Sequence, residues 1–234
     1  MVCGLQYVGW FDRGDEPGVE LLAAPVMAGA RCGGKPIYFS DVVVRADSPA
    51  RSLLDVRGRV WGYNEPTSHS GYALTRSWLA TQGFGDAFFG ALAGTGAHLR
   101  SFELLLDGQI DGTAIDSTVL ETELRSRPAL SRSVRVVQTL GPSPIPPVLI
   151  SRAVPESTRA ALRSCFLQMH LDPLGKQILA DAAMLRFVPV HDQDYAPIRT
   201  MSRLAGQLGA WDASEGPARR VGRADLLWAG LSGD

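Results

Sequence analysis

The sequence predicts an α/β protein whose sheets are mostly parallel. Short apolar runs alternate along the chain with segments of helical periodicity, an order typical of this class. Near the centre, an apolar run at 59–63 passes through a Ser-rich turn into an apolar-periodic helix at about 70–81. The chain has 234 residues, of which 45% are hydrophobic, so it can form a real core as one large or two small domains.

Each expected strand is a short apolar run bounded by turn residues. The runs lie at 19–27, 37–45, 59–63, 112–116, 134–139, 148–151 and 187–190. The expected helices have apolar periodicity and lie at 70–81, 98–107, 117–124, 155–168 and 174–183, with a short helix beginning at 48–50. Gly108 follows the helix at 98–107 in a position typical of a helix C-terminus. The Gly-rich segment 29–36 is expected to be a turn, and prolines exclude a helix at 141–147.

The central turn carries four consecutive hydroxyl or imidazole side chains, Thr67-Ser68-His69-Ser70. Because these residues precede a helix, they lie beside unpaired backbone N–H groups at the positive end of the helix dipole, which favours an anion. A Ser or Thr in this position is also an ordinary helix N-cap, and that alternative stays open. A second segment of the same kind ends in His98 and opens the next expected helix.

Charge and composition disfavour several classes of protein. The chain has 23 Lys plus Arg against 24 Asp plus Glu, so its formal net charge of −1 offers no basic field for nucleic acid or anionic lipid. No run reaches the roughly 18 apolar residues of a membrane span, and the first residues do not form a signal peptide. Cofactor fingerprints and metal-ligand patterns are also missing, so we expect neither a cofactor nor a metal.

The three cysteines do not form a disulfide framework or a zinc pattern. Cys3 and Cys32 flank one expected β-region and could pair in an oxidising compartment, although free thiols are favoured without an export signal. Cys165 shares a helix face with apolar side chains and is expected in the core.

Three segments carry a resemblance to a known family: YNEPTSHSGY, TGAHLRSFELLLDGQIDGTAID and VRVVQTLGPSPIPPVLIS. Their order and spacing closely resemble the periplasmic phosphate/phosphite/phosphonate-binding proteins of ABC transporters, over roughly residues 1–204. The resemblance implies a type II periplasmic-binding-protein-like fold, with two lobes of mostly parallel sheet, flanking helices and a cleft. It also implies a monomeric, non-enzymatic protein that captures a small phosphorus oxyanion in the periplasm for an ABC transporter permease.

The same resemblance assigns ligand contacts. Ser68, His69 and Ser70 would bind the anion's oxygens through side chains and N–H groups, and His98 would be a donor from the second helix. A buried histidine with only structural hydrogen bonds is the alternative for His98. Glu65 would repel a dianion and is expected to face solvent.

Two further residues are assigned by resemblance. Tyr7 would line the wall of the cleft, and a position in the hydrophobic core is the alternative. Asp116 would meet the non-phosphate end of the ligand, such as an amine, and it also fits a helix N-cap. His69 stands where aminophosphonate-binding members usually carry a small hydroxyl residue, so the oxyanion is left open.

The expected organisation follows from the same resemblance. Lobe one comprises 1–45 plus 142–205, lobe two comprises 46–141, and hinges lie at 44–47 and 139–144. The family's export signal and first β-α-β unit are not in this chain, so lobe one is expected to be incomplete and the chain to be a fragment or a late-started reading frame. The extension 206–234, with Trp211 and an amphipathic patch at 224–231, is expected to be poorly ordered rather than a docking helix.

Two alternative functions remain at this point. Ser70, His69 or His98, and Asp116 supply the residue types of a hydrolase triad, but the Gly-x-Ser-x-Gly elbow is missing. Adjacent Ser and His side chains at a helix start also point in different directions, which disfavours a nucleophile and base pair. A cytoplasmic ligand-sensing module of the same fold would explain the missing signal.

Overall fold

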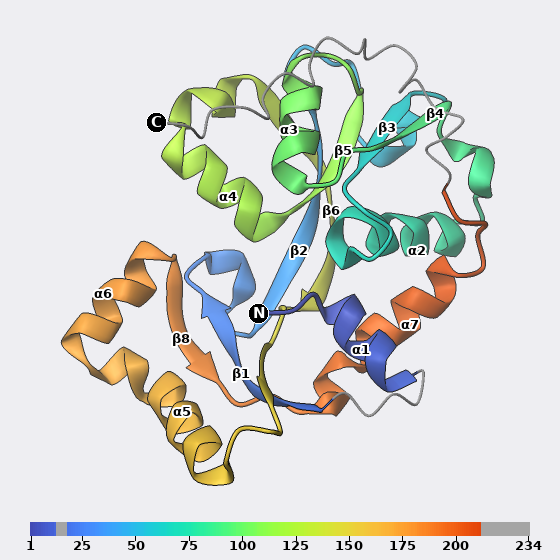
Figure 1. The fold of residues 1–234 in the computed structure, drawn as a ribbon. Helices are drawn as coiled ribbons and strands as arrows, with labels where there is room; N and C mark the ends of the chain where they lie inside the picture. Colours follow the sequence, from blue (N-terminus) through green and yellow to red (C-terminus); the bar gives the residue numbers. More distant parts are fainter. Residues whose placement is uncertain (13–17, 212–234) are drawn as a thin grey trace, which may run out of the picture.

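The computed structural model describes residues 1–12 and 18–211 and has two lobes, each built on its own β-sheet (Figure 1). The sheet of lobe one has the strand order β7-β1-β8, and the sheet of lobe two has the order β4-β3-β5-β2-β6. The expected two-lobed α/β architecture is confirmed.

Lobe two is a sheet covered by helices on both faces (Figure 1). Its strands are β2 (Ile37–Arg45), β3 (Val60–Tyr63), β4 (Ala91–Gly94), β5 (Gly112–Asp116) and β6 (Val134–Pro144). Its helices are α2 (Leu74–Thr81) on one face, and α3 (His98–Leu106) and α4 (Ser117–Ser126) on the other. Val42 and Val44 of β2 pack into the α2 core, whereas Val43 packs into the α3 and α4 core. Both faces are buried, which is why the run at 42–44 is apolar without alternation.

The strand pairing of lobe two is mixed. β3 pairs in parallel with β4 and β5, whereas β2 pairs antiparallel with β5 and β6. In lobe one, β1 pairs antiparallel with both β7 and β8. The expectation of mostly parallel sheets therefore holds only for β4-β3-β5, whose strands are joined by helical crossovers. β2 takes the chain into lobe two and β6 takes it out, so these two neighbours run in opposite directions.

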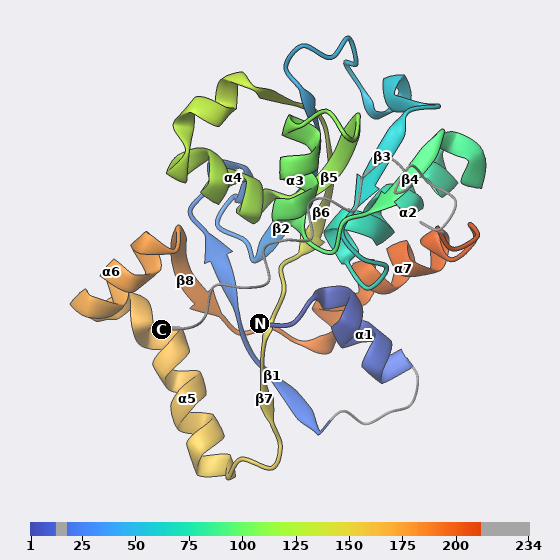
Figure 2. The same cartoon turned by 45° about the horizontal axis from the view of Figure 1, so that its top comes forward.

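Lobe one contains the smaller sheet and the C-terminal helices. Its strands are β1 (Val19–Met27), β7 (Val148–Ser151) and β8 (Met184–Val188), and its helices are α5 (Glu156–Gln168) and α6 (Pro173–Asp181). Helix α7 (Ala196–Ala205) packs against both α1 (Gly4–Asp12) and α2, and so connects the two lobes (Figure 2). The short helical turns are η1 (Ala30–Cys32), η2 (Leu53–Val56), η3 (His69–Ala73), η4 (Asp86–Phe88), η5 (Pro128–Arg132), η6 (Met169–Leu171) and η7 (Asp192–Tyr195).

Strands β1, β2, β5 and β7 have the bounds that the sequence predicted. β6 is longer than expected and continues through the proline-rich segment to Pro144. This extension is possible because β6 is an edge strand, where a proline breaks no ladder hydrogen bond on the open side. The sequence did not assign α1 or α7 as helices.

The division between the lobes lies earlier than the sequence suggested. The predicted boundary after Arg45 placed β2 in lobe one, but β2 is hydrogen-bonded within the lobe-two sheet. The connections between the sheets are residues 28–36 and 145–147. The predicted hinges at 44–47 and 139–144 instead lie at the end of β2 and within β6, where strand pairing restricts bending.

Residues 206–211 are packed rather than poorly ordered. Trp211 is only 5% exposed, and its ring contacts the rings of Tyr63, Tyr72 and Phe89. Its backbone N–H donates to the Tyr72 hydroxyl, and the Arg76 guanidinium donates to the carbonyls of residues 208 and 209. The patch at 224–231 lies outside the described residues. No helix among the described residues is long and apolar enough to cross a membrane.

Replacing Trp211 by alanine should destabilise the protein strongly, because the change removes a buried aromatic ring from the α2 core. We expect a loss of about 3 kcal/mol or more in the free energy of unfolding, measured by urea denaturation. Trp78→Ala, at a partly exposed ring that contacts Phe84, is the control and should cost less. A loss below about 1 kcal/mol for Trp211→Ala would contradict the packing described here.

Candidate functional site

The Ser-rich turn forms the start of a helix, as predicted. Ser68 is the N-cap of η3, with extended backbone angles of φ −80° and ψ 133°, and its hydroxyl accepts a hydrogen bond from Gly71 N–H at 3.1 Å. The first turn is π-helical and continues into α2. The capping alternative is therefore correct for the Ser68 side chain. The next backbone N–H, that of His69, is bonded to the Cys3 Sγ at 3.4 Å.

Two helix starts meet at Ser70 and His98. The Ser70 Oγ lies 3.1 Å from the His98 Nε2, and which atom donates depends on the tautomer of the imidazole. Ser70 is the second residue of η3, and His98 is the first residue of α3. The sequence predicted that these residues come together, and the structure places them in direct contact.

Gly71 makes this close approach possible. A Cβ atom at Gly71 would lie 2.0 Å from the Asn64 Oδ1 and 3.0 Å from the His98 Cε1, so any larger residue would force the Asn64 side chain to shift. Asn64 is only 9% exposed, and its Oδ1 has no hydrogen-bond partner among the described residues. A buried amide oxygen without a hydrogen bond is costly, and it can only accept, so it would pair with a donor and not with an anion.

The His69 side chain points away from the Ser70 and His98 pair. Its Nε2 lies 2.9 Å from the Ser143 Oγ on β6, and its Nδ1 is buried without a hydrogen-bond partner in the described part of the chain. Its imidazole is completely buried. His69 therefore offers its backbone N–H, rather than its ring, at the head of the helix.

Both histidines of the site are held in the neutral form. Burial lowers the pKa of His69 to about 4. Burial also lowers the pKa of His98 to about 4, although the negative charge of Glu65 and the backbone of Ala114 act in the opposite direction. Glu65 itself is exposed, as expected. At neutral pH the site therefore contains hydroxyls, neutral imidazoles and backbone N–H groups.

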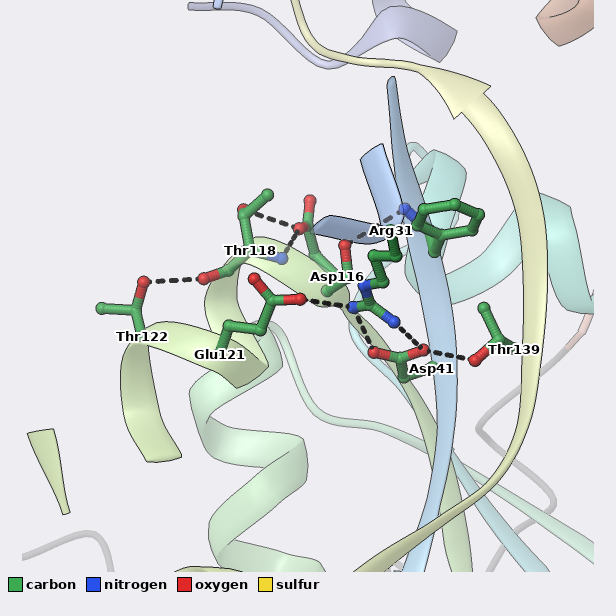
Figure 3. Close-up of polar contacts among 9 residues, drawn as sticks. Arg31, Asp41, Asp116, Thr118, Glu121, Thr122 and Thr139 are labelled. Atoms are coloured by element: carbon green, nitrogen blue, oxygen red, sulfur yellow. Dashed lines mark hydrogen bonds and ion pairs between the residues drawn. The ribbon is translucent and has the colours of Figure 1, made fainter. Parts of the chain in front are cut away.

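Asp116 caps helix α4 and also lies near the turn. Its Oδ1 accepts hydrogen bonds from Thr118 N–H at 2.8 Å and from the Thr118 hydroxyl at 2.7 Å (Figure 3). Burial raises the pKa of the Asp116 carboxyl, and the hydrogen bonds from Thr118 oppose this shift. The expected N-cap is therefore present, and the carboxylate remains a partly buried acceptor.

Strand β2 contributes two side chains that the sequence analysis missed. Tyr38 is fully buried, and burial, then Asp116 and Cys3, raise the pKa of its hydroxyl, whereas a hydrogen bond with Ser70 opposes them. The Ser40 hydroxyl donates to the Ser70 carbonyl at 2.7 Å. Polar side chains at alternating positions of an apolar strand were the available signal, since 38 and 40 share one face.

Cys3 is a third missed residue. Its Sγ accepts from the His69 N–H and donates to the Thr67 carbonyl at 3.7 Å, so the first residues of the chain cross the head of the helix. Cys3, Cys32 and Cys165 are free thiols, and Cys165 is exposed rather than in the core. The helix face bearing Cys165 looks outward from lobe one.

Tyr7 occupies the core position that the sequence allowed as its alternative. Its ring packs against Phe11 and Tyr195, and its hydroxyl donates to the Asp192 carboxylate at 3.0 Å. The Tyr7 hydroxyl therefore binds Asp192, and none of these contacts places Tyr7 beside Ser70.

The arrangement does not form a hydrolase triad. In a triad, the carboxylate orients the base by hydrogen bonding to its ring, whereas Asp116 bonds to Thr118. Within residues 1–12 and 18–211, no group of three His, Cys, Asp or Glu side chains could hold a metal ion. What the site does contain is a set of neutral donors at two helix starts, which suits a small anion.

A family model described as the periplasmic substrate-binding protein of phosphonate ABC transporters matches residues 1–195. The chain belongs to this family. Its members are periplasmic solute-binding proteins of ABC transporters and not enzymes. A comparison with curated protein sequences gave no match.

Solved structures show the same fold as this phosphonate-binding family member. The binding component of an ABC phosphonate transporter from Pseudomonas aeruginosa has a TM-score of 0.75 at 21% identity, covering 88% of this chain and 68% of that one. PhnD1 from Prochlorococcus marinus, in complex with methylphosphonate, has a TM-score of 0.72 at 19% identity, covering 87% and 76%. The periplasmic aliphatic sulphonate-binding protein of Escherichia coli has a TM-score of 0.56 at 14% identity, covering 88% and 79%. The type II periplasmic-binding-protein fold is thus confirmed.

The buried His69 and the partly buried His98 should make the protein acid-sensitive. Below pH 6.5 the unfolded chain protonates both imidazoles, whereas the folded chain resists protonation until about pH 4. Their contribution to stability is complete above pH 6.5 and is lost as the pH falls from 6.5 to 4, by about 3 kcal/mol for each histidine. Urea denaturation at pH 7, 5.5 and 4.5 should show this loss. His69→Gln, which removes one titrating group, should have a shallower slope, and an identical slope would contradict the assignment.

Proposed function

We propose that this family member captures a small phosphorus oxyanion at the start of η3 for uptake by an ABC transporter permease. The observation that carries the proposal is the contact between Ser70 and His98, which brings two helix starts to one point. Helix starts supply N–H groups and positive dipole ends, so an anion there is stabilised without a formal positive charge. We also propose the periplasm as its compartment and the monomer as its working form.

The contacts now made at this point are ones that an oxyanion can replace. The thiol of Cys3 is a weak acceptor for the His69 N–H. A charged phosphoryl oxygen accepts hydrogen bonds about twice as strongly as a neutral group. We therefore propose that the ligand takes hydrogen bonds from the His69 N–H, the Ser70 hydroxyl and the His98 ring. The Tyr38 hydroxyl, beside Ser70, is a further donor.

The ligand class follows from Asp116. A buried carboxylate beside a dianion is repulsive, whereas it is favourable beside a protonated oxygen or an ammonium group. The pKa of Asp116 is already raised by burial before any ligand is bound. Phosphite, phosphate and phosphonates are all compatible with the donors at the helix start. We propose that Asp116 selects for ligands that carry a proton or an amine at their other end.

The cytoplasmic sensor and hydrolase alternatives receive no support from the site. No contact described here favours the sensor hypothesis. The hydrolase reading requires a carboxylate on the base, and Asp116 is used otherwise.

Removing either donor should weaken binding. Isothermal titration calorimetry against phosphate, phosphite, methylphosphonate and 2-aminoethylphosphonate, with sulfate as a comparison, should find at least one ligand with submillimolar affinity. Ser70→Ala and His98→Ala should each lower that affinity by about tenfold or more, because a hydrogen bond to a charged group contributes roughly 1.5–3 kcal/mol. Ser126→Ala, whose hydroxyl bonds only within α4, is the control. Unchanged affinity in both site variants would sink the assignment.

Asp116→Asn should separate the ligands by charge. Asparagine is as good an N-cap as aspartate, so the start of α4 should remain intact. The affinity for 2-aminoethylphosphonate should fall about tenfold, since the variant loses one charge-assisted contact, while methylphosphonate binding should stay the same or improve. An equal loss for both ligands in the same titrations would contradict a selective role.

A further inference from the structure

The glycine-rich turn between β1 and β2 is attached to lobe one. The Ala28 N–H donates to the Ala183 carbonyl at 2.8 Å, and the Arg186 guanidinium donates to the Gly34 carbonyl at 3.1 Å. Cys32 is buried in a core cluster that contains Ala24 of β1 and Val190, and also Tyr38 of β2. The two hydrogen bonds attach both ends of the turn to lobe one.

One side chain of this turn reaches lobe two (Figure 3). The Arg31 guanidinium donates two hydrogen bonds to the Asp41 carboxylate of β2, at 3.0 and 2.7 Å. It also forms an ion pair with Glu121 of α4 at 2.8 Å. A guanidinium is well suited to this role, because its planar fork can hold both carboxylates at once.

The surroundings make Arg31 hard to release. Asp41 is only 2% exposed, and its other contact is the Thr139 hydroxyl of β6 at 2.8 Å. A buried carboxylate that loses its cationic partner remains desolvated without compensation, which is strongly unfavourable. The guanidinium also lies 5.0 Å from the centre of the Phe39 ring.

We infer that Arg31 is a clasp between the lobes: by holding Asp41 and Glu121 from the lobe-one side, it favours the closed arrangement in which the oxyanion is retained. This inference rests on the proposed oxyanion-binding function. Glu121 lies on α4, the helix that Asp116 caps, so the clasp acts on the element next to the proposed ligand contact. Opening the lobes would separate Arg31 from Glu121 first, since Glu121 is the more exposed partner.

Helix α4 offers a matched control. Glu123 pairs with Arg127 one turn later on the same helix, so this ion pair does not cross between the lobes. Glu121→Gln and Glu123→Gln are therefore the same substitution on the same helix, and only the first touches the clasp. Glu121→Gln also leaves the buried Asp41 with its partner, so the variant should fold.

The first experiment measures oxyanion affinity by calorimetry in both variants. Glu121→Gln should weaken binding about two- to fivefold, as a partly exposed ion pair allows, and 1 M salt should reduce the difference from wild type. Glu123→Gln should bind as wild type does. Arg31→Gln should weaken binding further, with its folded state checked by urea denaturation. Equal affinities for wild type and Glu121→Gln would overturn the clasp.

The second experiment needs no ligand and so separates the clasp from the proposed function. Spin labels at the exposed Cys165 of lobe one and at Arg125→Cys of lobe two report the distance between the lobes by double electron–electron resonance, with mass spectrometry confirming that the more buried Cys3 and Cys32 stay unlabelled. Glu121→Gln should shift the distribution toward longer distances, whereas Glu123→Gln should not. If no oxyanion binds but this shift appears, the binding proposal fails and the clasp stands. Identical distributions in all three proteins would overturn the clasp itself.

Discussion

The arrangement of the site depends on how closely the start of η3 approaches the start of α3. Gly71 has room for hydrogen only, because Asn64 and His98 lie against its Cα. β3 pairs in parallel with both β4 and β5. The helices that follow β3 and β4 therefore begin at the same edge of the sheet. The contact between Ser70 and His98 is the consequence of this close approach.

This geometry favours an electrically neutral site. A buried charge would need a partner, and neither His69 nor His98 has a carboxylate bonded to its ring. Burial instead keeps both imidazoles unprotonated. Donors without formal charge hold an anion through dipoles, which makes release compatible with tight binding because no ion pair has to be broken. In such a neutral site, the partly buried carboxylate of Asp116 would distinguish between ligands in the way we propose.

The sequence was informative where structure is local. Apolar runs gave the bounds of β1 and β5, and the hydroxyl turn was assigned to a helix start because capping is decided by adjacent residues. Contacts between segments far apart in the chain could not be predicted from the sequence. Tyr38 and Cys3 reach the turn only because β2 and the first residues fold against it, and a single sequence carries no signal for such pairings.

The same limit explains the other differences. The sequence could not show that β2 belongs to lobe two, since strand order depends on pairing between segments far apart in the chain. Tyr7 matched a family position by pattern, yet its hydroxyl is bonded to Asp192 from a segment about 185 residues away. Trp211 follows a stretch that is loose in composition, and only its aromatic neighbours in three-dimensional space fix it.

Polar contacts lie in or beside both connections between the sheets. Arg31, in the first connection, holds Asp41 and Glu121. Ser143, two residues before the second connection, is bonded to the His69 ring, while the backbone N–H of the same His69 lies at the head of the helix. The Ser143 to His69 hydrogen bond therefore joins the end of β6 directly to the turn. Conversely, an anion that orders the His69 N–H also restrains the ring that contacts β6. If the proposed anion binds the His69 N–H, this contact would couple ligand binding to the position of β6.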